Sequence, residues 1–379
     1  MDQIPAAMDR HLDVIQCHTD GGLLLGASSL TGQYWLGSLW YYQNPSNAPD
    51  VEKCTAGVQL ESGLTDARWM DKNKVLVGLD TGGIEIWELI ENYNTFVHVH
   101  TTVEHDDIVS SLHLSCDSKR AVSCGYDRCI KLWDVESLSS VHSFRGHADI
   151  VECVRCHPSE PSIFLSCSQD NRILLWDTRK PRPASIVGMF PIEPTFRPSI
   201  IDSAPLKNSP RCLSWQPQSQ NMFAVGSSTG QIVFKDTRIS IGTPLSIIPH
   251  TRDVYKLEFC QNRPQLLASV SEDCTTVVTS IETQKQVYKD SSHKDYVRGL
   301  SWMNDVQLYT CGWDSKVTLN NVVHLLSHKS ESEDTSVKMD VNGEGESNEN
   351  LNCQKSSCGV ECNGNDISIE AGGGDTETT

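Results

Sequence analysis

Four segments of the chain share one pattern of polar residues. In each segment a serine or threonine precedes an aspartate by four residues, and a histidine lies 21 to 23 residues before that aspartate. The four sets are His105, Ser123 and Asp127; His147, Ser166 and Asp170; His250, Ser269 and Asp273; and His293, Thr310 and Asp314. Four matches at three linked positions indicate an internal repeat, which constrains the architecture more strongly than the length of 379 residues does.

Each repeat consists of short β-rich runs separated by turn residues. Residues 150–155, 162–167 and 171–176 are runs of about six residues, and a further run at 139–144 precedes the histidine. Asn, Asp, Gly, Ser and Pro lie between the runs and accept the backbone angles that turns require. Three or four strands in each 41 to 47 residues are typical of a propeller blade.

Two of the repeats end in recognisable sequences, Ile130–Asp134 (IKLWD) and Ile173–Asp177 (ILLWD), and these resemble the WD40 repeat. We therefore expect an all-β fold, a seven-bladed WD40 β-propeller over residues 10–328, with a loop at 178–210 that contains seven prolines. The third strands of the seven blades are predicted to end near Trp40, Trp87, Trp133, Trp176, Lys235, Thr279 and Asn320.

The remaining blades depart from the pattern and are assigned by the rhythm of their strands. The fifth blade has no histidine, Val225 in place of the hydroxyl residue and Thr229 in place of the aspartate. The outer strand of the last blade could come from residues 322–327 or from a segment before residue 12.

Charge is concentrated in the C-terminal segment 329–379, which has 12 acidic residues against 3 lysines and no aromatic residue. Such a composition predicts a disordered acidic tail. Its cysteines, Cys353, Cys358 and Cys362, match no common zinc spacing, so we expect no metal site.

The whole chain has a formal charge of −18, which argues against direct nucleic-acid binding. No apolar run is long enough to span a membrane, and no secretory signal is visible, which favours cytosol or nucleus.

The recurring Ser, His and Asp residues suggest a hydrolase at first sight, but a catalytic triad is needed only once. In WD40 repeats the aspartate accepts a hydrogen bond from the histidine, the histidine contacts the hydroxyl, and the hydroxyl contacts the indole N–H of a tryptophan, here Trp133 or Trp176. No G-x-S-x-G or G-x-G-x-x-G motif is present. We therefore predict structural tetrads, no enzymatic activity and no cofactor.

Cys153 and Cys156 lie three residues apart in one predicted strand, so their side chains should point to opposite faces of the sheet. This placement argues against a redox pair or a shared metal ion.

Trp35 is an additional tryptophan, five residues before the repeat position Trp40 and close to a predicted turn at Gly32. A tryptophan near a turn should be at least partly exposed, and exposed tryptophans often anchor interfaces. The alternative is that Trp35 covers the rim of the propeller.

The stretches 21–40, 104–111 and 164–185 resemble the WD-repeat subunits of the methylosome, which are partners of the type II (symmetric) protein arginine methyltransferase. The resemblance implies a non-catalytic adaptor that inserts Trp35, with Tyr34 and Gln33 beside it, into the methyltransferase. Gln33 stands where the family pattern has an arginine. The implied substrates are Arg-rich Sm-type ribonucleoprotein core proteins and the tails of histones H2-A and H4, with roles in snRNP assembly and transcription regulation in cytoplasm and nucleus.

Two other WD40 roles remain open on the sequence. A substrate receptor of a ubiquitin ligase would need a basic cluster at the top of the central channel, for which Arg128, Arg172 and Lys316 are candidates. A chromatin reader acting alone would bind histone tails without a methyltransferase.

Overall fold

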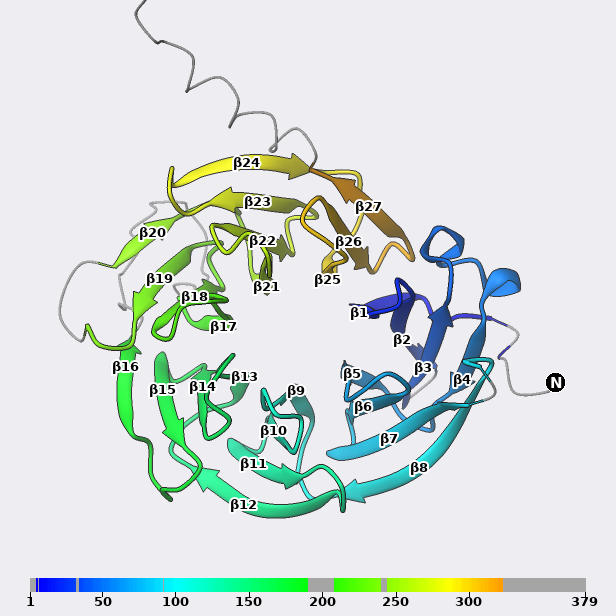
Figure 1. The fold of residues 1–379 in the computed structure, drawn as a ribbon, viewed down its shortest axis with the longest axis horizontal. Helices are drawn as coiled ribbons and strands as arrows, with labels where there is room; N and C mark the ends of the chain where they lie inside the picture. The colour runs from blue at the N-terminus through cyan, green and yellow to red at the C-terminus, as the bar shows by residue number, and fades with distance from the viewer. Residues whose placement is uncertain are drawn as a thin grey trace, which may run out of the picture. The chain divides into compact units, whose positions relative to one another are not determined.

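Seven antiparallel sheets surround a central channel in a computed structural model that describes residues 5, 7–31, 34–90, 92–189, 208–239 and 244–322 (Figure 1). The prediction of a seven-bladed propeller is confirmed. The tail at 329–379 and its three cysteines lie outside the described residues. No helix within the described ranges is long and apolar enough to span a membrane.

The first four blades contain four strands each. Blade 1 has β1 (His11–Cys17), β2 (Leu23–Thr31), β3 (Tyr34–Tyr42) and β4 (Ala56–Gln59), with the 3-10 helices η1 (Pro45–Asn47) and η2 (Val51–Lys53) before β4. Blade 2 has β5 (Leu64–Trp69), β6 (Lys74–Leu79), β7 (Gly83–Ile90) and β8 (Thr95–Val103). Blade 3 has β9 (Val109–Leu114), β10 (Arg120–Gly125), β11 (Cys129–Asp134) and β12 (Ser139–Arg145). Blade 4 has β13 (Val151–Cys156), β14 (Ile163–Ser168), β15 (Arg172–Asp177) and β16 (Ser185–Met189).

The remaining three blades follow the same order from the channel outward. Blade 5 has β17 (Pro210–Trp215), β18 (Met222–Ser227), β19 (Ile232–Asp236) and β20 (Leu245–Ile247). Blade 6 has β21 (Val254–Phe259), β22 (Leu266–Ser271), β23 (Thr276–Ser280) and β24 (Lys285–Asp290), and blade 7 has β25 (Val297–Trp302), β26 (Gln307–Gly312) and β27 (Val317–Asn321). All seven predicted strand ends therefore lie in third strands.

The outer strands of blades 4 and 7 test two of the expectations from the sequence. The expectation of a loop throughout 178–210 is wrong at Ser185–Met189, because these residues pair with β15 and form the outer strand of blade 4. The sheet of blade 7 has three strands among the described residues, and the candidate outer strand at 322–327 lies outside them from residue 323 onward.

Apolar side chains fill the space between neighbouring blades. Between blades 3 and 4, Leu132 and Phe144 belong to one buried cluster with Val154, Phe164 and Trp176. Successive side chains of a strand point to opposite faces, so each sheet supplies one set of residues to each neighbour. Burial of both faces explains why the second strands of the blades, such as β6 (KVLVGL) and β14 (IFLSCS), consist mostly of apolar and small residues.

The ring closes where blade 1 packs on blade 7. Ile15 and Trp40 share a buried cluster with Tyr309 and Cys311. The backbone N–H of Cys17 donates to Ser301 Oγ over 3.1 Å. These contacts join residues almost 300 positions apart in the sequence, so the closed ring requires both ends of the propeller to be folded.

Truncating a side chain at this closure should weaken the whole ring. Ile15 is fully buried, and the Ile15→Ala variant is expected to lose about 2–5 kcal/mol of unfolding free energy through the cavity it leaves. The Ile186→Ala variant is the control, because Ile186 is 53% exposed on blade 4. Urea denaturation of the full chain measures both, and equal midpoints for the two variants would contradict this account of closure.

Candidate functional site

Hydrogen-bonded chains of four side chains cross blades 3 and 4. In blade 4, His147 Nδ1 lies 3.0 Å from Asp170 Oδ2 and His147 Nε2 lies 2.7 Å from Ser166 Oγ. Trp176 Nε1 donates to the same Ser166 Oγ over 2.8 Å. Blade 3 repeats the arrangement with His105, Asp127, Ser123 and Trp133 at distances of 2.7 to 2.8 Å.

The chemistry of the end groups fixes the direction of these chains. An indole N–H can only donate, and a carboxylate can only accept. The Ser166 hydroxyl therefore accepts from the indole and links it to His147 Nε2, and His147 Nδ1 donates to Asp170. Burial alone would raise the pKa of Asp170, but hydrogen bonds from His147 and the backbone N–H groups of Ala148 and Arg172 lower it well below its usual range.

Blades 6 and 7 keep the first three members and change the fourth. In blade 7, Asn320 Nδ2 replaces the indole and donates to Thr310 Oγ1 over 3.1 Å, while His293 Nδ1 lies 3.0 Å from Asp314. In blade 6, His250 lies 3.2 Å from Asp273 and 2.8 Å from Ser269. Thr279 holds the fourth position there, and its hydroxyl is buried without a hydrogen-bond partner within the described part of the chain.

Blade 1 replaces the tetrad with a shorter chain that the sequence pattern missed. Trp40 Nε1 donates to Ser38 Oγ over 2.8 Å, and Ser38 Oγ donates to Asp9 over 2.6 Å. Asp9 lies outside every repeat and carries no local signal in the sequence.

Blades 2 and 5 use other substitutes. In blade 2, Trp87 Nε1 donates directly to Glu85 over 2.8 Å. In blade 5, Thr229 Oγ1 donates to Asn208 Oδ1 over 3.0 Å, so this pair takes the places of aspartate and histidine. Polar pairs spread over every blade satisfy buried groups, and none of them forms a unique cluster of the kind that catalysis needs.

Cysteines do not form a metal site among the described residues. Within those ranges no group of three or more His, Cys, Asp or Glu side chains could hold a metal ion. Cys153 and Cys156 both lie in β13 and are buried.

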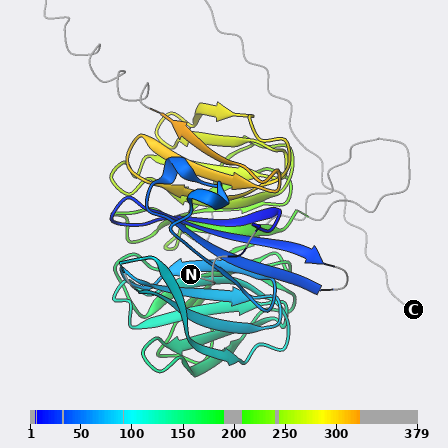
Figure 2. The same ribbon diagram turned by 90° about the vertical axis from the view of Figure 1, so that its right-hand side faces the viewer.

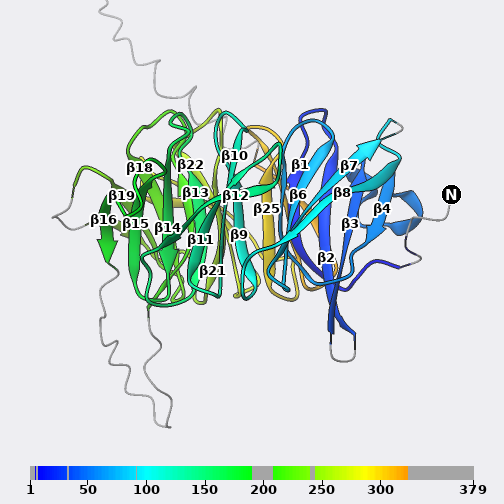
Figure 3. The same cartoon turned by 90° about the horizontal axis from the view of Figure 1, so that it is seen from below.

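The hairpin of β2 and β3 extends beyond the ring on one side (Figures 2 and 3). The ladder of blade 3 is a useful comparison. There Trp133 pairs with Ala121, and the ladder ends three pairs later, at Cys124 and Ile130. In blade 1, Trp40 holds the same position and pairs with Leu25. Three pairs beyond Trp40, at Ser28 and Gly37, the β2–β3 ladder does not end but continues for three more pairs, to Thr31 and Tyr34. At about 3.3 Å per residue, these pairs lengthen the hairpin by about 10 Å.

Apolar side chains lie near the end of this hairpin. Tyr34 is 74% exposed and Leu30 is 55% exposed. Trp35 pairs with Leu30 and is partly buried, with its ring centroid 5.7 Å from that of His11. A Cβ on Gly63 would lie 2.8 Å from Trp35 Cβ, so this glycine permits the close approach of the blade 2 loop. Gln33 lies outside the described residues.

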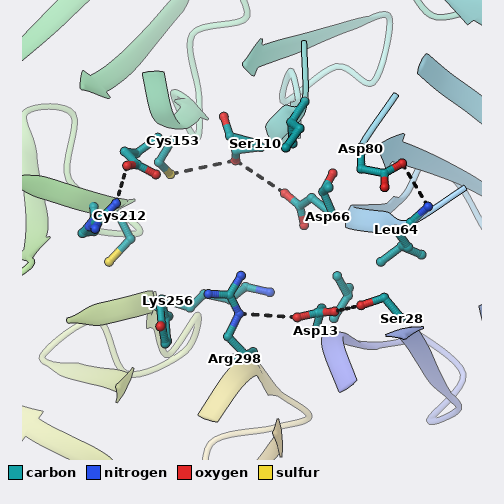
Figure 4. A pocket seen from close by; sticks show the side chains of 18 of the residues that line it. Asp13, Ser28, Leu64, Asp66, Asp80, Ser110, Cys153, Cys212, Lys256 and Arg298 are labelled. Atoms are coloured by element: carbon teal, nitrogen blue, oxygen red, sulfur yellow. Dashed lines mark hydrogen bonds and ion pairs between the residues drawn. The ribbon is translucent and has the colours of Figure 1, made fainter. Parts of the chain in front are cut away.

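Trp35 also lines a cavity of about 550 Å³ at the mouth of the central channel, together with Trp313 and Tyr255 (Figure 4 shows this cavity). The predicted basic cluster of Arg128, Arg172 and Lys316 does not line it. Arg172 instead forms an ion pair with Asp170, with 2.9 Å between Nη2 and Oδ2.

Comparisons with known proteins agree with this geometry. The family model "WD domain, G-beta repeat" matches residues 96–134 and 138–177. The chain is 36% identical to the methylosome protein WDR77 of Xenopus laevis, over 83% of this chain and 90% of that protein. It is 26% identical to the histone acetyltransferase type B subunit 2 of Debaryomyces hansenii, over 72% of this chain and 68% of that one. A chain of the COPII outer coat vertex has the same fold, with a TM-score of 0.70, 18% identity and coverage of 83% and 85%.

Removal of one tetrad carboxylate should destabilise the propeller in a pH-dependent way. The Asp170→Ala variant is expected to lose about 1–3 kcal/mol at pH 7, because His147 Nδ1 is left without its acceptor. The pKa of Asp170 is lowered in the folded state, so its contribution is present above about pH 4 and lost as the pH falls further.

Urea midpoints at pH 7 and pH 3 measure this difference. The gap between wild type and Asp170→Ala should shrink at pH 3, whereas the exposed control Glu282→Ala should match wild type at both values. A gap that stays constant with pH would refute the assignment of Asp170 as a charged acceptor.

Proposed function

The chain belongs to the WDR77 family of WD-repeat methylosome proteins, and from this relationship we propose that it is a non-catalytic adaptor that binds the symmetric protein arginine methyltransferase. The long hairpin of β2 and β3 is the docking element. The observation that carries this assignment is the placement of Leu30, Tyr34 and Trp35 at the end of the hairpin that extends beyond the ring.

Large aromatic side chains suit this role because they bury much area for little loss of conformational freedom. Trp35 is held by His11 on one side and by the backbone at Gly63 on another. A side chain that is already positioned loses less entropy on binding than a free one. Trp35 therefore provides the anchor, and Tyr34 adds exposed contact area beside it.

The charge of the chain supports a role in substrate capture. Residues 1–328 carry half of the net charge of −18, and the segment 329–379 carries the other half. An acidic adaptor attracts Arg-rich segments, such as those of Sm-type proteins and of histones H2-A and H4, and raises their concentration near the methyltransferase. Screening by salt weakens this attraction. The adaptor acts in cytoplasm and nucleus, in snRNP assembly and transcription regulation.

The ubiquitin-ligase alternative is less well supported by the arrangement of charges. Arg128, Arg172 and Lys316 were its candidate residues, and none of them lines the cavity at the channel mouth. Arg211 and Arg298 do line it, but both form ion pairs with carboxylates of the same cavity. A stand-alone chromatin reader would need tight histone-tail binding by the isolated protein.

The Trp35→Ala variant should bind the methyltransferase weakly. Truncation of a central tryptophan anchor typically costs at least about 2 kcal/mol, or about 30-fold in affinity. Size-exclusion co-elution at low micromolar concentration should therefore show loss of complex for Trp35→Ala. The Ile248→Ala variant should retain it, because Ile248 is an apolar residue that is 73% exposed after β20, away from the hairpin.

Full co-elution of the Trp35→Ala protein would show that the anchor lies elsewhere. Affinity purification of the wild-type protein with mass identification separates the three roles. The methyltransferase should dominate the eluate, and ligase adaptor subunits without any methyltransferase would overturn the proposal.

A further inference from the structure

The central channel contains a second cavity, of about 420 Å³, on the side opposite the β2–β3 hairpin. Turns that follow the inner strands line it, including Cys116, Pro217 and Gln261. Three cationic residues line both this cavity and the one beside Trp35. They are Arg68 from β5, Arg155 from β13 and Lys256 from β21, and we call them the basic layer.

Arg155 and Lys256 are buried and Arg68 is mostly buried, and the donors of the two arginines are only partly used. Arg155 is 8% exposed and donates from Nη1 to Ser111 Oγ over 3.0 Å and to a backbone carbonyl over 2.7 Å. Arg68 Nε lies 3.6 Å from Asp66 Oδ1, too far for a hydrogen bond. Both Nε and Nη2 of Arg68 are buried without a hydrogen-bond partner among the described residues. Lys256 lies in the same layer and is 7% exposed.

Nearby carboxylates do not balance these three charges. Asp66 and Glu258 are the acidic groups that act on all three, and burial raises the pKa of Glu258. Asp66 also accepts from the backbone N–H of Leu112 over 3.0 Å, which uses part of its capacity. Burial, and the positive charge of Arg68 after it, lowers the pKa of Lys256 to about 8.

The two histidines of the cavity add no charge of their own. His157 Nδ1 accepts from the backbone N–H groups of Ser159 and Glu160 over 3.2 and 3.0 Å, so this ring is neutral. Burial and the cations Arg155 and Arg68 lower the pKa of His113 well below its usual value. The three cations therefore outnumber the two carboxylates that act on all of them. The Cys153 thiol beside Arg155 offsets part of this difference, because, against the effect of burial, a hydrogen bond from Cys167 and the charge of Arg155 lower its pKa to about 6.

We propose that the 420 Å³ cavity binds a small phosphate-bearing metabolite whose oxygens accept hydrogen bonds from Arg68 and Lys256. Its lining contains a single carboxylate, that of Glu258, whereas five carboxylates line the cavity beside Trp35, those of Asp13, Asp66, Asp80, Glu152 and Asp253. Figure 4 shows Lys256 of the basic layer together with two of these carboxylates, Asp13 and Asp80. An oxyanion is therefore favoured at the end away from the hairpin.

Phosphate matches the donor set for two reasons. A guanidinium can bind two phosphate oxygens in parallel, here once the Arg68 side chain turns its buried Nε and Nη2 toward the cavity, and an ammonium adds a point charge to a third oxygen. The depth of the layer within the channel favours a small molecule over the side chain of a large partner. The site is independent of the hairpin, so binding there can be tested without the methyltransferase.

The experiment uses the full-length chain and inorganic pyrophosphate, titrated by calorimetry and by thermal shift at constant ionic strength held with NaCl. Saturable binding and a saturable rise in melting temperature are expected. Lys256→Gln and Arg68→Gln should each weaken pyrophosphate binding about 10- to 100-fold. Lys131→Gln is the matched control. Lys131 is nearly as buried as Lys256, at 9% against 7% exposed, but it pairs with Glu104 and lies in β11, away from the channel.

The melting temperature without ligand shows whether the variants fold. Lys256→Gln removes one of three neighbouring and largely buried cations, so its unliganded melting temperature should equal or exceed that of wild type. No saturable response to pyrophosphate in wild type, or equal affinity in wild type and Lys256→Gln, would overturn the proposal. Binding of a phosphoserine peptide at Lys256 without any binding of pyrophosphate would overturn the assignment to a small ligand.

Discussion

The structure depends on the packing of each sheet against two neighbours. Every blade buries both faces, and the first blade must meet the seventh for the outermost faces to be covered. Ile15 and Trp40 from the start of the chain reach Tyr309 and Cys311 near its end. Closure leaves only short outer edges exposed and joins all seven sheets in one core. Loops and hairpins are then carried at fixed positions.

Most of the recurring polar residues serve this packing. The chain from Trp176 through Ser166 and His147 to Asp170 satisfies donors and acceptors that neighbouring sheets would otherwise bury unpaired. What distinguishes blade 1 is the longer ladder of β2 and β3, which places Tyr34 beyond the ring. The ring therefore acts as a scaffold, and binding is proposed at two places on it. The docking hairpin and the phosphate site lie on opposite sides of the ring.

The sequence was sufficient to predict the features that repeat locally. The His, Ser or Thr, and Asp residues of four blades and the seven third strands could be predicted because these residues recur at fixed spacing. Asn208 was missed although it lies 21 residues before Thr229, because the pattern expected a histidine there. Asp9, which accepts from Ser38 below Trp40, was missed because it lies outside the repeat spacing. The basic layer was missed for the same reason: Arg68, Arg155 and Lys256 are about 90 to 100 residues apart and meet only in the closed ring. The outer strand β16 was hidden between prolines.

The central claim is that an inert ring docks through the hairpin that carries Trp35. Hydrogen–deuterium exchange of the full-length chain, alone and with the methyltransferase bound, tests it most directly. The account predicts that the strongest new protection falls in residues 28–37, with the outer strands of blades 3 to 5 unchanged. Unaltered exchange across 28–37, together with protection of another blade, would contradict it.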